Sequence, residues 1–153
     1  MEYVAIFGNE NSYSINGTIT GKVELSQPTK NATCFVEYEL YGIPNGYHGF
    51  HLHEKQLGNT PNPCDGACSH FNPTNQVHGY HVGDLCFNIY SFNGCSRGSF
   101  HCPRLDLFIY DISGTSIVIH EEEDNGGAIR GHYDQESLKT GRAGKRIACA
   151  NLY

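Results

Sequence analysis

The sequence lacks the features that define several large classes of protein. No segment approaches the ~18 consecutive apolar residues that a membrane-spanning helix needs. The first residues have neither the basic segment nor the long apolar stretch of a signal peptide. We therefore expect a cytoplasmic protein that does not bind membranes.

Basic residues are also scarce. The chain has 10 lysines and arginines against 16 aspartates and glutamates, so its formal net charge is −6. This balance disfavours binding to nucleic acids or to anionic membranes. An anionic substrate would therefore need local positive charge to approach the protein.

Helical periodicity is a third absence. Charged residues make up only 17% of the chain, eighteen residues are glycine, and no internal repeat is present. Short apolar or alternating segments separated by turn residues occur instead, and they predict the strands of an antiparallel sandwich or barrel. The predicted strands cover residues 4–7, 14–25, 33–41, the segment around His51, and residues 85–90, 96–102, 105–109, 116–120 and 147–152.

Two segments between the predicted strands, 55–83 and 121–146, are too long for ordinary turns. Loops of this length inside a compact domain are usually functional. The length of 153 residues is that of one domain, so we expect a single domain over residues 1–153. The first long loop carries many of the histidines.

Five of the nine histidines lie between His51 and His81. His51 and His53 are two residues apart, so a strand would direct both rings to the same side. His78, His81 and Asp84 follow at intervals of three in a glycine-rich segment. One His-x-His pair alone is more often structural than metal-binding, but the further donors indicate a metal site for two ions.

Seven cysteines are many for a cytoplasmic protein. Their odd number leaves at least one free or paired with another chain. Cys34, Cys86 and Cys102 lie in strand patterns and are expected to be buried thiols. Cys95 and Cys102 flank a short segment, so a bridge between these two is an alternative.

Five motifs, in order along the chain, resemble those of one known family, the copper–zinc superoxide dismutases of the intracellular eukaryotic type. They are Gly49-Phe50-His51-Leu52-His53-Glu54, His70-Phe71-Asn72-Pro73, His81-Val82-Gly83-Asp84-Leu85, Val118-Ile119-His120-Glu121 and the segment from Lys139 to Cys149. The match runs from about Val4 to Leu152. One such motif would be weak evidence, whereas five at compatible spacings are specific.

The resemblance implies the ligands of two metal ions. Copper would be bound by His51, His53, His70 and His120, and zinc by His70, His78, His81 and Asp84. His70 belongs to both sets and would bridge the ions through its two ring nitrogens. Asp124 would hydrogen-bond to His51 on the copper side and to His78 on the zinc side.

Further residues acquire roles from the same resemblance. Arg146 would bind the substrate anion beside copper, Thr140 would narrow the channel, and Lys139 would attract the anion. Positive charge there would offset the negative net charge locally. Cys64 and Cys149 would form a disulfide, with Cys68 as a competing partner for Cys149.

The fold that the resemblance implies is an all-β, eight-stranded antiparallel Greek-key β-barrel or sandwich with two long functional loops. The implied activity is the dismutation of superoxide to dioxygen and hydrogen peroxide in antioxidant defence, with Cu²⁺/Cu⁺ and Zn²⁺ as cofactors. A homodimer and a copper chaperone are the expected partners besides superoxide. The alternative is a non-catalytic copper- and zinc-binding or copper-delivery protein on the same fold, which would be expected to lack His120 or Arg146.

The chain departs from the family pattern in several places, including Arg142 at a neutral position and a poor match from Cys95 to Tyr110. Three departures affect the loops and the C-terminal stretch. His78 and His81 are only three residues apart, so the zinc-binding loop is shortened. The second long loop has added residues around 130–133. Few residues follow Cys149, which shortens the C-terminal stretch that helps the dimer contact in the family.

Other polar residues receive simpler interpretations. His48 is expected to make a buried hydrogen bond, and His101 and His132 are expected to face solvent. In the acidic run that ends at Asp124, only Asp124 is expected to belong to the site. Arg130 is interpreted as a surface charge, with anion guidance as the alternative.

Overall fold

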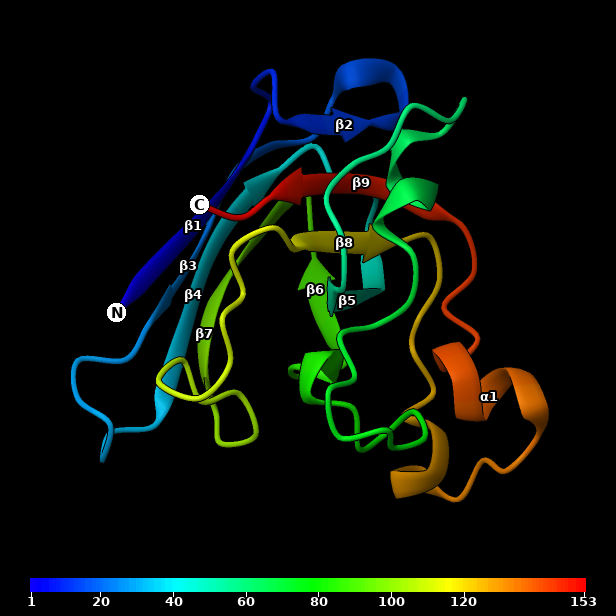
Figure 1. Cartoon of the computed structure of the whole chain (residues 1–153). Coiled ribbons are helices and arrows are strands. Elements are labelled where there is room, and N and C mark those ends of the chain that lie inside the picture. Colours follow the sequence, from blue (N-terminus) through cyan, green and yellow to red (C-terminus); the bar gives the residue numbers. More distant parts are fainter.

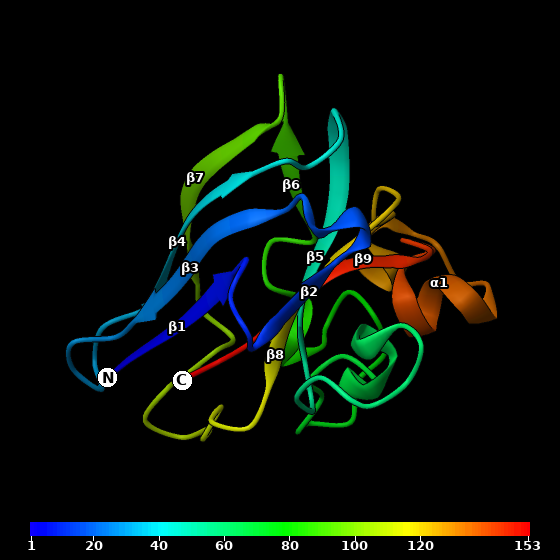
Figure 2. The ribbon, with the colours of Figure 1, turned by 90° about the horizontal axis from the view of Figure 1, so that it is seen from above.

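The computed structural model describes residues 1–153, and nine strands form two antiparallel sheets in it. One sheet has the order β1 (Glu2–Phe7), β3 (Thr20–Ser26), β4 (Cys34–Tyr41) and β7 (Cys95–Cys102). The other has the order β2 (Ser12–Ser14), β9 (Arg146–Asn151), β8 (Ser116–His120), β5 (Gly46–His53) and β6 (Asn88–Ser91). The two sheets face each other, as Figures 1 and 2 show.

Helical structure is limited to short segments. Four are 3₁₀ helices, η1 (Ile15–Gly17), η2 (Pro63–Ala67), η3 (Val82–Asp84) and η4 (Gly127–Arg130), and one is an α-helix, α1 (Gln135–Thr140). Except for η1, all of them lie in the connections after β5 and β8. No helix is long and apolar enough to cross a membrane.

The strand order contains a Greek key. β5 pairs with β6, and a tight turn closed by the bridge between Phe92 and Cys95 connects β6 to β7. The chain then returns, so that β8 pairs with β5. The spatial order β8-β5-β6-β7 is the order 4-1-2-3 of that motif. The predicted Greek-key sandwich is therefore confirmed, and the short strand Ser12–Ser14 brings the number of strands to nine, one more than the eight that the resemblance implies.

The core lies between the inner faces of the sheets. In β4, Cys34, Val36 and Leu40 are buried while Glu37 and Tyr41 are exposed, as expected of a strand with one face in solvent. β8 is different, because all five of its residues are buried. Its outer face is covered, and the covering segment is the loop that carries the disulfide.

Four details differ from the prediction. The strand expected over residues 14–25 is interrupted by η1, where Asn16 and Gly17 have positive φ, so β3 begins only at Thr20. The strand expected from residue 85 begins only at Asn88, because Leu85 and Phe87 have positive φ and cannot continue a ladder. Residues 105–109 form turns instead of a strand, although Leu105 and Leu107 are buried in the core. Helix α1 was not predicted, since its six residues are too few for a helical period.

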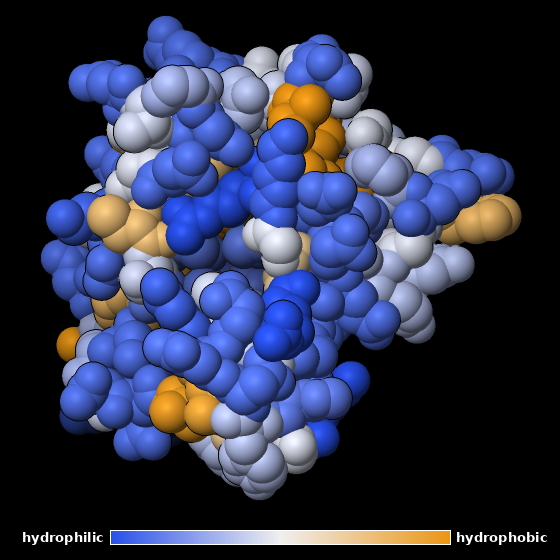
Figure 3. Space-filling model, turned by 90° about the vertical axis from the view of Figure 1, so that its right-hand side faces the viewer, coloured by the Kyte–Doolittle hydropathy of each residue, from blue (hydrophilic) through white to orange (hydrophobic).

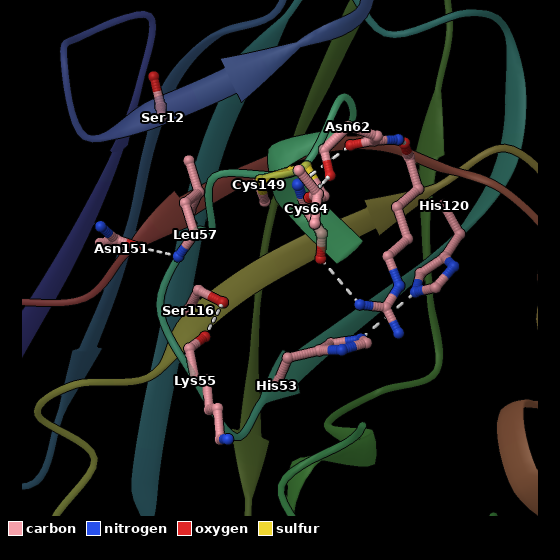
Figure 4. Close-up of a disulfide and its surroundings, with 12 residues drawn as sticks. Ser12, His53, Lys55, Leu57, Asn62, Cys64, Ser116, His120, Cys149 and Asn151 are labelled. Carbon is pink, nitrogen blue, oxygen red and sulfur yellow. Dashed lines mark hydrogen bonds between the residues drawn. A yellow bond between two sulfur atoms is a disulfide. The ribbon is translucent and has the colours of Figure 1, made fainter. Parts of the chain in front are cut away.

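One disulfide ties the first long loop to the barrel (Figure 4). Cys64 and Cys149 are linked, 85 positions apart, with their Cα atoms at 5.6 Å. Nearby, the Ser116 hydroxyl donates to the Lys55 carbonyl at 2.7 Å. The loop therefore packs against β8 and β9 along its first half.

The remaining cysteines are free. Cys34 and Cys102 are buried as expected, whereas Cys86 is only partly buried. Cys68 is also free, so it does not displace Cys64 from the bridge. The alternative bridge between Cys95 and Cys102 is wrong, because these residues lie at opposite ends of strand β7. An extended strand holds its ends too far apart for a disulfide.

Candidate metal centre

The predicted copper ligands come from two neighbouring strands and one loop. His51 and His53 are the alternate residues at the end of β5, and both rings are buried on the side of the sheet that the loops cover. His120 ends β8, where the β8–β9 register shifts between Ile119 and His120. Such an irregularity redirects a side chain, here toward the other rings.

His70 completes this set from the first long loop. An isolated bridge pairs it with His53, so the loop backbone runs beside the end of β5. One ligand atom from each of His51, His53, His70 and His120 lies within 4.8 Å of the others. The Nε2 atoms of His53 and His120 are 3.4 Å apart and point toward each other, and a dashed line joins them in Figure 4.

Each ring uses its other nitrogen to fix its orientation. His51 Nε2 contacts Asp124 Oδ2 at 2.5 Å, His53 Nδ1 contacts the Cys68 carbonyl at 2.9 Å, and His120 Nδ1 contacts the Gly144 carbonyl at 3.0 Å. His51 Nδ1 and His70 Nε2 are buried without any hydrogen-bond partner. Together with the Nε2 atoms of His53 and His120, these two nitrogens give four imidazole donors, a set that suits Cu²⁺.

The predicted zinc ligands converge on a second point. The Nδ1 atoms of His70, His78 and His81 each lie 2.9 to 3.0 Å from Asp84 Oδ1. His70 Nδ1 is 3.2 Å from His78 Nδ1 and 3.3 Å from His81 Nδ1. Tetrahedral zinc with bonds of ~2.0 Å needs donors about 3.3 Å apart, so the four atoms fit this ion.

His70 is common to the two groups. Its Nδ1 atom belongs to the second group, while its Nε2 atom is unpartnered on the side of the first. The His70 and His51 rings lie with centroids 4.1 Å apart. The two candidate metal positions are therefore adjacent, with one imidazole between them.

Asp124 connects the two groups from behind. Its Oδ2 atom lies 2.5 Å from His51 Nε2, and its Oδ1 atom lies 2.8 Å from His78 Nε2. The carboxylate is fully buried, and Oδ1 also accepts from the Gly126 amide at 2.7 Å. This is the arrangement predicted for Asp124, and it distinguishes this residue from its exposed acidic neighbours.

The protonation states of the metal-free protein suit metal binding. Burial, together with neighbouring histidines, holds the pKa values of His51 and His53 well below their usual range. Burial likewise lowers the pKa of His120 to about 3. These rings are neutral at physiological pH and have free lone pairs for a metal.

His78 and Asp84 behave differently because carboxylates and imidazoles pair here. Burial opposes a charge on His78, but hydrogen bonds to Asp124 and Asp84 raise the pKa of His78 to about 9. Burial alone would raise the pKa of Asp84, but hydrogen bonds to three histidines hold it well below its usual range. A cation at this point would replace the proton, since the carboxylate already favours positive charge there.

Arg146 lies at the start of β9 and reaches the first loop. Its Nη1 atom donates to the Cys64 carbonyl at 2.8 Å and its Nη2 atom to the Cys68 carbonyl at 2.5 Å. The side chain is half-buried, and burial lowers its pKa from its ordinary value. Because Cys68 also accepts from His53, the guanidinium is held beside the copper-side rings.

Lys139 and Thr140 end helix α1. Lys139 is exposed and lines a hollow of about 500 Å³ whose wall includes His70. The Thr140 hydroxyl bonds to Glu136 Oε1 at 2.7 Å. The molecular face on the α1 side is mainly hydrophilic, with only small, separate hydrophobic patches (Figure 3).

The other histidines lie as predicted. The His48 ring contacts the His120 carbonyl at 2.8 Å and the Pro44 carbonyl at 2.7 Å, and it is buried. His101 and His132 are exposed. The sequence did not predict the backbone carbonyls of Cys68 and Gly144, which orient the rings of His53 and His120.

Comparisons with known proteins agree with this centre. Residues 19–152 match the family described as copper/zinc superoxide dismutase (SODC). The chain is 39% identical over 144 residues to an extracellular superoxide dismutase [Cu-Zn] of Brugia pahangi, covering 90% of this chain and 70% of that protein.

Two further relatives have similar lengths. Superoxide dismutase [Cu-Zn] of Onchocerca volvulus is 38% identical over 143 residues, covering 86% of this chain and 87% of the relative. The enzyme of that name from Saccharomyces cerevisiae is 38% identical over 139 residues, with the same coverages. The match over most of the chain, together with the paired donor groups, shows that the chain belongs to the copper/zinc superoxide dismutase family.

Proposed function

We propose that the protein dismutes superoxide, converting two superoxide anions and two protons to dioxygen and hydrogen peroxide. His51, His53, His70 and His120 would hold copper, and His70, His78, His81 and Asp84 would hold zinc. The whole chain, residues 1–153, would act as one catalytic domain. The observation that carries the proposal is His70, which directs one nitrogen into each of two buried donor groups.

Copper, when bound, would supply the one-electron redox chemistry of the two half-reactions. The protein would supply one of the two protons through His70, whose Nε2 atom has no partner in the protein and is free to take up and release one; the other would come from solvent. Asp84 and the two neighbouring histidines fix the opposite side of the ring. The ring therefore keeps its position whichever state Nε2 is in.

Arg146 would dock the anion. Its guanidinium is always charged, and two carbonyls fix its plane beside His53. Lys139 would raise the local concentration of superoxide at the hollow next to His70. Thr140 would limit the width of the channel at the end of α1.

The test is a superoxide assay on protein whose copper and zinc contents are measured. We expect turnover by the metal-replete protein that disappears on copper removal and returns on copper addition. His70→Ala should abolish turnover, while His132→Ala, at an exposed histidine, should leave it unchanged. Stoichiometric copper without turnover would support the non-catalytic metal-binding alternative instead.

The role of Arg146 has its own test. Arg146→Ala should lower kcat/KM by at least roughly tenfold, because a preorganised positive group is lost, with copper content unchanged. Arg130→Ala removes an exposed arginine from the second loop and serves as the control. Loss of copper from the Arg146 variant would contradict an anion-docking role.

We also propose a cytoplasmic homodimer that receives copper from a chaperone. Resemblance to the intracellular type supports this, although one relative is named extracellular. Sedimentation of the purified protein tests the dimer, and fractionation of its native cells tests the location. Copper content after expression with and without a copper chaperone tests the third part.

A further inference from the structure

The short turn between His78 and His81 must hold two zinc-side histidines with only two residues between them. Its backbone is fixed first by the second long loop. The His78 amide donates to the Leu138 carbonyl at 2.7 Å, and the His78 carbonyl accepts from the Ala128 amide at 3.0 Å. These bonds hold the start of the turn and leave its far end free.

Asp84 fixes the inner side of the same turn. Its Oδ2 atom accepts from the Gly79 amide at 2.7 Å and from the His81 amide at 3.0 Å. Gly79 has φ +106, and a Cβ there would come within 2.8 Å of the Gly126 carbonyl. The turn is thus packed closely against η4, and its amides are satisfied.

The carbonyls of the turn accept hydrogen bonds from a residue that follows strand β7. Arg104, two residues beyond the end of β7, donates from Nη1 to the Gly79 carbonyl at 2.7 Å. The same nitrogen lies 3.4 Å from the His81 carbonyl. The guanidinium carbon is 5.6 Å from the centre of the Tyr80 ring. One side chain therefore contacts all three residues from Gly79 to His81.

An arginine suits these contacts for a physical reason. Its planar head can donate along its edge while its face covers an aromatic ring, which a lysine cannot do in the same way. None of the salt bridges in the structure involves Arg104, so no carboxylate competes with the turn for its guanidinium. The side chain is half-buried, which strengthens such contacts.

We propose that Arg104 is a positioning residue for the zinc half of the centre. By tying the Gly79 and His81 carbonyls to the barrel, it sets the direction from which the His81 ring reaches zinc. The proposal rests on the zinc ligands assigned under the proposed function.

The first test measures zinc affinity in copper-free protein by competition with a chromophoric chelator. Arg104→Ala should weaken zinc binding by roughly tenfold or more, the usual effect of losing a group that orients a metal ligand. Arg97→Ala is the matched control, because it removes an exposed arginine from β7 itself. Unchanged affinity in the Arg104 variant, or equal losses in both variants, would overturn the proposal.

A second measurement separates positioning from general stability. Co²⁺ bound in the zinc position gives visible absorption that depends on the geometry of its donors. We expect a changed Co²⁺ spectrum and a smaller zinc-induced rise in the unfolding temperature for Arg104→Ala. A lower unfolding temperature of the metal-free protein alone, with the same spectrum and the same zinc-induced rise, would overturn the proposal.

Two milder variants keep the test informative if Arg104→Ala does not fold. Arg104→Lys keeps the charge without the planar fork, and Tyr80→Leu removes the ring but leaves the carbonyls in place. Both should weaken zinc binding by less than the alanine variant, and wild-type affinity in both would overturn the proposal. If the wild-type protein binds both metals but shows no turnover, the proposed function fails while these zinc measurements remain valid.

Discussion

At the scale of single residues, Asp124 is the most connected side chain behind the metal centre. It joins one ring of each donor group, at 2.5 Å for His51 and 2.8 Å for His78, and it is fully buried. Gly141 lies directly over it, since a Cβ on that glycine would come within 2.2 Å of Oδ1. The carboxylate therefore controls the orientation of both rings at once.

We predict that Asp124→Asn lowers zinc affinity by about 10- to 100-fold, because the amide can no longer accept from both rings. Chelator competition on the purified variant measures the loss. Glu123→Gln provides the control, since Glu123 is an exposed neighbour in the same acidic run. Equal zinc affinity in the Asp124 variant and the wild type would contradict the prediction.

How much of the site the sequence predicted depends on the kind of group. The donor side chains were predicted, because imidazoles and carboxylates at motif spacings have a recognisable pattern, and the structure brings the eight donor positions together as two groups. Arg104 was not predicted, since no motif marks it. The carbonyls of Cys68 and Gly144 could not be found, since every residue has a carbonyl. A positive φ of 61° at Cys68 is visible only in the fold.

At the scale of elements, the disulfide is the main covalent support of the first loop. It joins residues separated by 85 positions, and its sulfur atoms lie in a small buried cluster with Ala67 and Val118. The loop on which Cys64 lies also supplies the carbonyl that binds Arg146. Loss of the bridge would therefore affect the loop, β9 and the anion-docking residue together.

We predict that Cys64→Ala lowers the free energy of unfolding by roughly 4–5 kcal/mol, the chain-entropy value for a loop of this length. Urea unfolding of the metal-free protein, under non-reducing conditions, measures it. Cys95→Ala is the control, since this cysteine is free. If reduction of the wild type leaves its unfolding midpoint unchanged, the bridge has no such role.

Helix α1 is stabilised by the side chain of Asp134, which contacts residues near both of its ends. The Asp134 carboxylate caps its first turn through Ser137 and also pairs with Arg142 beyond its last turn, at 2.6 Å. Hydrogen bonds from Ser137, and then the pairing with Arg142, hold the pKa of Asp134 well below its usual range. Since the pKa of Asp134 is lower in the folded protein than in the unfolded chain, the ionised carboxylate stabilises the folded protein. This stabilisation is present above about pH 4 and is lost as pH falls below it.

We therefore expect Asp134→Ala to increase amide hydrogen exchange of Ser137 and Leu138 severalfold at pH 7. The wild-type protein should keep its protection from pH 7 down to pH 5. Glu10→Ala, at an exposed site far from α1, is the control. Unchanged exchange in the Asp134 variant would show that packing alone holds the helix.

The elements themselves were predictable where apolar residues alternate, as in β4, or where β-branched residues follow one another, as in β8. The errors have physical causes. The apolar residues Leu105 and Leu107 alternate with other residues and therefore predicted a strand. They are buried in the core, but the segment that carries them has no strand pairing. Leu85 and Phe87 are apolar residues at positive φ, a conformation that apolar composition does not reveal.

At the scale of the whole molecule, the negative net charge repels the anionic substrate. The net charge is −6, whereas Lys139 and Arg146 place positive charge at the hollow and beside the copper-side rings. Local attraction of superoxide operates only over distances that salt does not screen, about 8 Å at physiological ionic strength. The association rate should therefore depend on salt.

We predict that kcat/KM falls as ionic strength rises from about 10 mM to several hundred millimolar, since screening weakens the attraction. Lys139→Gln should lower the rate at low salt and flatten this dependence. Lys30→Gln, in an exposed turn far from the centre, should do neither. A rate that rises with salt would mean that repulsion by the net charge dominates.

The two donor groups also differ in where the chain places them. Three of the four copper-side histidines belong to strands β5 and β8, which the barrel holds in place, while all four zinc-side residues lie on the loop from His70 to Asp84. The copper-side frame is therefore set mostly by the sheet, whereas the zinc-side frame depends on the contacts of one loop with η4, α1 and Arg104. A change that weakens those contacts should disturb the zinc position first and leave most of the copper-side frame in place.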